Sequence, residues 1–216
     1  AFNEKGGEGS NPGMVRFLSS DLSCGFAESS QPLTDDPATR LAIEYGGSNL
    51  YRINPDNSYT AVSYLAPENP VEATATGSFF FSVLGASQDC AKVLFSTKYR
   101  YPGIPSLGLY EWDEGTLRNA GVIPGPEGET PVSATGKGVS EDGSRVFFTA
   151  TRKTSPDAAE IGKEAVFVRE DGTTTRDLTQ SETSIPAGNA TYQWATPNGS
   201  RVFFTANAGL TEESSS

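Results

Sequence analysis

The side chains that could carry chemistry in this 216-residue chain are mainly carboxylates, because the sequence holds 27 Asp and Glu residues, two cysteines and no histidine. Without histidine, this chain cannot form Ser-His-Asp or Cys-His catalytic arrangements, histidine zinc sites or histidine general bases. The chemistry that remains would use a pair of carboxylates, as glycosidases do, or oxygen ligands around a calcium ion.

The acidic residues do not form a pattern typical of either chemistry. Asp157 and Glu160 lie together in one long loop, and the other clusters are Asp35–Asp36, Glu111–Glu114 and Glu212–Glu213. None matches an EF-hand or a nonapeptide calcium repeat, so we predict no cofactor, with calcium as the one ion these residues could hold. Nothing singles out a catalytic pair of acids, and we expect solvated surface charge and no enzymatic activity.

Three aromatic residues lie in or beside the long loop KYRYPGIPSLGLYEW, namely Tyr99, Tyr101 and Trp112. Exposed aromatic residues on loops are typical anchors for a protein or a sugar. The alternative, which we favour, is that they cover the edge of a sheet. They are therefore candidates for a loop binding surface and not an assigned site.

The elements that would position these residues come from a repeat. Gly143–Ala150 and Gly199–Ala206 share eight identical residues, GSRVFFTA, and weaker copies lie at Leu18–Ser29 and Ala86–Thr97. Each copy has a polar turn before its apolar strand, and Asp or Asn at such a turn bonds to its own backbone while Gly accepts a positive φ. We therefore predict a structural role for the turn residues Asp21, Asp89, Asp142, Gly143, Asn198 and Gly199.

A second hairpin pattern follows each of the first three turns, at Leu50–Val62, Leu109–Gly121 and Val166–Leu178. Each unit of about 55 residues thus holds four antiparallel strands, which is typical of the blades of a β-propeller. The first strand of a unit is rich in small residues, as crowding near a central axis requires. The apolar Val-Phe strand should be buried on both faces, between neighbouring blades.

The turn and strand SEDGSRVFF (residues 140–148) and TPNGSRVFF (residues 196–204) resemble the TolB-type, WD40-like β-propeller repeat of secreted bacterial proteins. The resemblance implies an all-β propeller and says almost nothing about a ligand, because this fold hosts unrelated functions. We expect a flexible Gly-rich arm over residues 1–13 and a partial propeller over residues 14–216. Its expected blades are approximately 14–71, 72–124, 130–180 and an incomplete 190–216.

The last blade has only two strands before the sequence LTEESSS. An open propeller would expose a sheet edge and an uncovered blade face. We therefore expect that this chain is a segment of a longer polypeptide or that another chain completes it, and an oligomer is one consequence.

The two cysteines, Cys24 and Cys90, follow the turns of the first and second units closely. Equivalent turns of neighbouring blades lie near each other, so we predict a disulfide that closes a loop of 65 residues. In the chain-entropy model such a bond stabilises the fold by about 3–4 kcal/mol. It would place the protein in an oxidising compartment.

The net charge of −11 argues against nucleic acid as a partner, since phosphate binding requires clustered Lys and Arg. No apolar run approaches the ~20 residues that span a bilayer. We expect a non-catalytic, extracellular or cell-envelope module that binds a protein or a glycan or has a structural role. The alternatives are a carbohydrate-active propeller enzyme that uses carboxylates and the propeller portion of a larger hydrolase.

Overall fold

The computed structural model describes residues 13–37, 39, 47–63, 81–98, 101, 103–105, 108–125, 128–152, 162–182 and 188–211. The expected N-terminal arm therefore lies, except for Gly13, outside the described residues. The chain divides into two compact units, the first built on β1–β4 and the second on the strands that follow.

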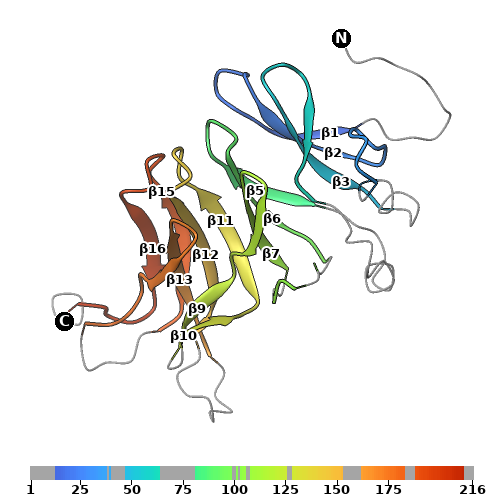
Figure 1. Cartoon of the computed structure of the whole chain (residues 1–216). Helices are drawn as coiled ribbons and strands as arrows, with labels where there is room; N and C mark the ends of the chain where they lie inside the picture. The colour runs from blue at the N-terminus through green and yellow to red at the C-terminus, as the bar shows by residue number, and fades with distance from the viewer. Residues whose placement is uncertain are drawn as a thin grey trace. The chain divides into compact units, whose positions relative to one another are not determined.

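The first unit contains one four-stranded antiparallel sheet in the order β1-β2-β3-β4 (Figure 1). Its core comes from β2 and β3, where Phe26, Leu50 and Tyr51 are fully buried. The β3–β4 turn is closed by Asp56, whose carboxylate accepts a hydrogen bond from Ser58 N at 2.9 Å. The strands are β1 (Met14–Leu18), β2 (Gly25–Ser29), β3 (Asn49–Ile53) and β4 (Tyr59–Ala61).

The second unit contains two more antiparallel sheets of the same four-strand order and two hairpins (Figure 1). One sheet comprises β5 (Ser82–Ala86), β6 (Lys92–Ser96), β7 (Leu109–Asp113) and β8 (Thr116–Asn119). The other comprises β11 (Ala134–Val139), β12 (Arg145–Arg152), β13 (Lys163–Glu170) and β14 (Thr174–Asp177). The hairpins are β9 (Val122–Gly125) with β10 (Gly128–Pro131), and β15 (Ala190–Ala195) with β16 (Val202–Ala206).

The all-β class and the four-stranded antiparallel units predicted from the sequence are confirmed. The hairpin β9–β10 was not predicted, because its Gly- and Pro-rich sequence carries no apolar alternation. It packs against β14 within the second unit. Its apolar residues Val122 and Ile123 are buried.

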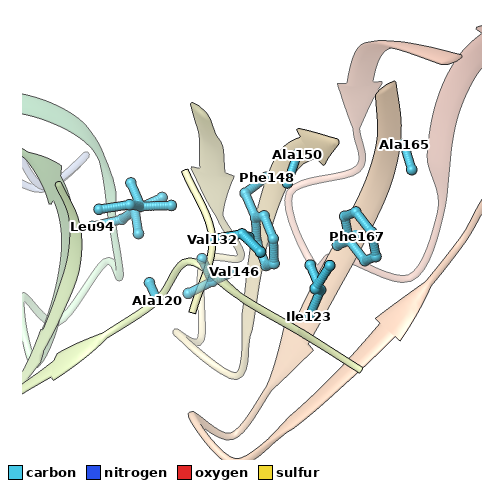
Figure 2. Packing of buried hydrophobic residues seen from close by; sticks show 10 residues of the cluster. Leu94, Ala120, Ile123, Val132, Val146, Phe148, Ala150, Ala165 and Phe167 are labelled. Carbon is cyan, nitrogen blue, oxygen red and sulfur yellow. The ribbon is translucent and has the colours of Figure 1, made fainter. Parts of the chain in front are cut away.

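The core of the second unit lies between its two four-stranded sheets (Figure 2). Leu94 and Leu109 from one sheet approach Gly136 of the other so closely that a Cβ at Gly136 would lie 2.9 and 3.0 Å from their methyl carbons. Phe148 and Phe167 stack at 5.3 Å on the same side. Burial of each such phenyl ring stabilises the fold by about 2–3 kcal/mol.

Neighbouring apolar side chains of β12 point to opposite faces of its sheet, and both faces are covered. Val146 and Phe148 belong to the core with Leu94, while Phe147 lies on the other face, 6.4 Å from the ring of Tyr192. All three residues of β12 are at most 2% exposed. The prediction that the Val-Phe strand is buried on both faces is thus confirmed for β12.

Candidate interaction surface and the turns that position it

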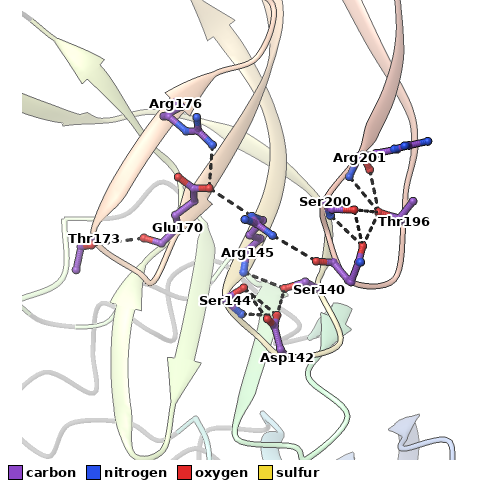
Figure 3. A network of polar contacts seen from close by, with 11 residues as sticks. Ser140, Asp142, Ser144, Arg145, Glu170, Thr173, Arg176, Thr196, Ser200 and Arg201 are labelled. Carbon is purple, nitrogen blue, oxygen red and sulfur yellow. Dashed lines mark hydrogen bonds and ion pairs between the residues drawn. The ribbon is translucent and has the colours of Figure 1, made fainter.

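The turn between β11 and β12 is closed by the carboxylate of Asp142. Its Oδ1 accepts hydrogen bonds from Ser140 Oγ at 2.6 Å, from Ser144 N at 3.0 Å and from Ser144 Oγ at 2.8 Å (Figure 3). The bond from Ser140, followed by the bond from Ser144 N, lowers the pKa of Asp142 from 3.8 to about 2. Gly143 supplies the positive φ of 72° that lets the chain reverse here.

The other three turns have the same arrangement. The hydrogen bond from Ser23 N makes the largest contribution to lowering the pKa of Asp21, and the bond from Ser19 Oγ makes the next largest. The amide oxygen of Asn198 replaces the carboxylate in the last turn. The equivalent backbone bonds run from Ser23 N to Asp21 (3.1 Å), from Ala91 N to Asp89 (3.0 Å) and from Ser200 N to Asn198 (3.1 Å).

Within the second unit, each turn is hydrogen-bonded to the turn of the next repeat. Gln88 N donates to the carbonyl of Glu141, and Glu141 N donates to the carbonyl of Pro197, both at 2.8 Å. Arg145 Nη1 also donates to the carbonyl of Asn198 at 3.3 Å. Because Pro197 has no N–H group, it cannot donate in its turn to a following repeat.

The last hairpin exposes the side chains that the preceding repeat buries. Phe203 holds the same place in GSRVFFTA as Phe147, yet Phe203 is 50% exposed and Phe147 is 2% exposed. Trp194, which is 54% exposed, stacks on Phe203 at 5.7 Å with an angle of 24° between the rings. For β16, the predicted burial on both faces is therefore wrong, because no described residue covers this face.

The hairpin also presents an open backbone edge. β12 pairs with β11 on one side and with β13 on the other, whereas β16 pairs only with β15 among the described strands. An unpaired strand edge offers N–H and C=O groups that can pair with another strand. The face of Trp194 and Phe203 together with the edge of β16 forms the candidate interaction surface, which we call the open hairpin surface.

A buried acid lies between the two sheets of the second unit. Glu111 on β7 is 1% exposed, and neither carboxylate oxygen has a hydrogen-bond partner among the described residues. Burial raises the pKa of Glu111, and the nearby charges of Arg118 and Lys92 lower it in part. Arg169 lowers that pKa least, and its Nη1 donates to both carboxylate oxygens of Glu129, at 2.7 and 2.8 Å.

The expectation that the acidic cluster Glu111–Glu114 is solvated is therefore wrong for Glu111. On strand β7 the side chains alternate, so Glu111 lies on the same face as Leu109, which belongs to the core. This alternation was the signal in the sequence that would have revealed a buried acid.

Two of the three aromatic candidates are buried, so an exposed binding surface made from them is not what the structure shows. Trp112 lies on β7 and is 2% exposed, and Tyr101 is 7% exposed. Tyr99 lies outside the described residues. Trp112 alternates with Glu111 on a central strand, and a side chain there packs in the interior on either face of the sheet.

The predicted disulfide is confirmed. Cys24 and Cys90 are both disulfide-bonded, and the chain has no third cysteine.

No metal site appears in the described parts of the chain, where no three or more Asp, Glu or Cys side chains are grouped to hold an ion. Asp35 and Asp36 are described, whereas Asp157, Glu160 and Glu212–Glu213 lie outside the described residues. Among the described residues there is also no helix with the length and apolar character that a membrane span needs.

No protein-family model matches the chain, and a comparison with curated proteins finds no match. Among solved structures, the chain is similar to a TolB protein from Agrobacterium tumefaciens, with 13% identity, a TM-score of 0.39 and coverage of 87% of this chain and 51% of that one. It is also similar to a prolyl endopeptidase, with 15% identity, a TM-score of 0.44 and coverage of 89% and 26%. The chain thus spans about half the length of the first protein and about a quarter of the second.

Proposed function

We propose that this chain is a non-catalytic β-propeller module of the extracellular space or the cell envelope, and that it binds a protein partner through the open hairpin surface. One observation carries the proposal: the shared residues Val-Phe-Phe-Thr-Ala are all buried in the third repeat, at Val146–Ala150, and none of them is buried in the last repeat, at Val202–Ala206. A soluble domain rarely leaves two stacked aromatic side chains exposed beside an open strand edge unless a partner covers them.

The β-propeller assignment rests on the repeat and on the four-stranded sheets in chain order. The disulfide supports an oxidising compartment. No specific observation in the described residues favours the carbohydrate-active enzyme or the hydrolase portion, and both stay predictions of the sequence.

The proposed mode of binding follows the strand pairing of β12. β12, which shares Val-Phe-Phe-Thr-Ala with β16, pairs antiparallel with β13 over eight residues, from Arg145 with Glu170 to Arg152 with Lys163. A partner strand that resembles β13 would add to the edge of β16 by main-chain hydrogen bonds. Alternate side chains of that strand would then contact Phe203 or Phe204.

The test uses a synthetic peptide with the sequence of β13, KEAVFVRE (residues 163–170). Titrated against the whole chain, it should bind saturably and change the emission of Trp194, which stacks on Phe203 of β16. The variant Trp194→Phe should lose most of the signal, and a peptide of scrambled sequence should not bind. Equal responses to both peptides, or none to either, would contradict recognition at this edge.

A further inference from the structure

The other repeats show which position covers the residue equivalent to Phe203. Positions are compared by counting from the Ser or Thr that begins each turn, which is Ser19, Ser87, Ser140 and Thr196. The residue seven places after this position is Leu94, Phe147 and Phe203 in the last three repeats, and it points toward the following repeat. The first two are buried, because a following repeat is present.

The residue that covers this position lies four places before the next turn. Gly136 packs on Leu94, where a Cβ would come within 2.9 Å, and Tyr192 packs on Phe147 with 6.4 Å between ring centroids. At both junctions this residue pairs with the same strand position in its own sheet and lies directly before a β-bulge. The same two positions therefore make the contact between repeats at both junctions, as Gly136 with Leu94 and as Tyr192 with Phe147.

In the first repeat, the residue four places before the turn is Val15, which also lies directly before a bulge. Val15 is 43% exposed, whereas its equivalent Gly136 packs against the preceding sheet. Two more apolar side chains at junction positions are exposed there: Leu18, 48% exposed and equivalent to the packed Val139, and Leu22, 71% exposed and equivalent to Gly143. We call Val15, Leu18 and Leu22 the leading face.

The chain thus carries both halves of one junction, and both are exposed. We propose that the open hairpin surface of one copy packs against the leading face of a second copy, with Phe203 on Val15, and that two such junctions close a dimer. Among its described residues each copy carries three four-stranded sheets and the two-stranded hairpin β15–β16, so two copies bring together six complete blades and two half blades, within the range of 4–8 blades that is typical of propellers. The contact joins two different patches, and such a contact forms a closed ring only if its rotation closes.

The proposed junction must leave room for the indole of Trp194. Trp194 lies two places before its turn, the position that Gly85 and Gly138 hold in the two preceding repeats. A Cβ at Gly85 would lie 2.9 Å from Val139 N, so no large side chain fits there. A Cβ at Gly138 would have no atom within 4 Å, so the junction after the third sheet is wider at this point. The proposed junction is of the wider kind, with Trp194 against Leu18.

The proposed junction also lacks one interaction that the internal junctions have. Gln88 N and Glu141 N each donate to the next turn, but Pro197 has no N–H to donate to the turn of the second copy. The apolar contact must then supply most of the affinity. Glu141 is the equivalent residue in the third repeat, so a Glu at position 197 would restore the backbone N–H donor.

The proposal rests on the proposed function in that it uses the open hairpin surface, but its test measures the oligomeric state and not the binding of a strand. Sedimentation equilibrium of the whole chain should give a mass about twice the 22.8 kDa of one chain. Phe203→Glu and Val15→Glu should each weaken dimerisation on the order of 100-fold, because either buries a charge at the junction. Pro197→Glu should tighten it about fivefold for each junction.

Two controls separate this proposal from unfolding and from other contacts. Met14→Thr removes an apolar side chain that lies on the same strand as Val15 and is 51% exposed. Thr is the residue that the third and last repeats have at this position, as Thr135 and Thr191, so the variant should leave the dimer unchanged. A heterodimer of one Val15→Glu chain and one Phe203→Glu chain retains one intact junction. A mixture of the two variants should therefore dimerise more strongly than either variant does alone. A monomeric or polymeric wild-type chain would overturn the proposal, as would a dimer that survives Phe203→Glu. Failure of the peptide titration alone would refute only the strand recognition.

Discussion

Replacing Glu111 with Gln should stabilise the protein at neutral pH. The carboxylate is 1% exposed, neither of its oxygens has a hydrogen-bond partner in the described part of the chain, and burial raises its pKa above the ordinary value of 4.5. A group whose pKa is raised by folding stabilises the folded state fully below its unfolded pKa. That contribution is lost as the pH rises through the folded pKa, so the buried position of Glu111 costs stability at neutral pH relative to an uncharged side chain.

The size of the effect follows from two opposing contributions. An uncompensated buried charge costs several kcal/mol, and the attraction of Arg118, Lys92 and Arg169 offsets part of that cost. We expect Glu111→Gln to raise the free energy of unfolding by about 1–3 kcal/mol at pH 7.5. For a chain of this size the melting temperature should then rise by roughly 2–10 °C.

Thermal unfolding followed by circular dichroism at pH 7.5 and pH 4 measures this gain. At pH 4 Glu111 is mostly protonated and resembles Gln, so the gain should largely vanish. Glu28 provides the matched control, since it is also buried but accepts hydrogen bonds from Arg16 and Ser48, and Glu28→Gln should lower the melting temperature. If Glu111→Gln lowered the melting temperature, or raised it equally at both pH values, the acid would be a stabilising ion-pair partner and the reasoning would fail.

Two further predictions concern the bond and the turns that hold the repeats. Replacing Cys24 and Cys90 together by Ser should lower the free energy of unfolding by about 3–4 kcal/mol, measured by urea denaturation, and reducing agent should not destabilise the double variant further. Asp142→Ala should cost about 1 kcal/mol at pH 7, a figure kept small because the carboxylate is exposed. Asp142→Asn should cost less, because Asn198 makes the same bonds, and a larger loss for Asn than for Ala would contradict the turn geometry. Because folding lowers the pKa of Asp142 from 3.8 to about 2, its contribution is present above about pH 4 and is lost as the pH falls toward 2, so the Asp142→Ala penalty should shrink in urea titrations over that range.

The local elements were predictable because they depend on residues close in sequence. The turns at Asp142 and Asn198 need an acceptor side chain, a following Gly and a flanking Ser or Thr, all of which lie within five residues. The disulfide prediction needed one further assumption, that equivalent turns of neighbouring repeats lie near each other. Hydrogen bonds from Gln88 N to Glu141 and from Glu141 N to Pro197 show this for the repeats of the second unit.

The burial of individual side chains was less predictable, because it depends on what lies across a sheet face. Glu111 and Trp112 follow a long loop in the sequence, so Glu111 was expected to be solvated, and Trp112 was expected either to cover the edge of a sheet, which was favoured, or to be an exposed anchor. Both are instead on β7, a central strand of its sheet, where each face packs against other residues.

The pair of identical strands shows the limit of local sequence most directly. Gly143–Ala150 and Gly199–Ala206 have the same residues and the same hairpin register, so their local propensities are equal. The exposure of the phenyl ring nevertheless changes from 2% at Phe147 to 50% at Phe203, and the cause lies in Tyr192 and Gly199, which follow the first strand and have no described counterpart after the second. Phe203 holds the position that the first strand of the following repeat covers at Phe147. A partner that covers Phe203 should therefore present a strand that resembles the first strand of a repeat. Val15 at the start of this same chain meets that requirement.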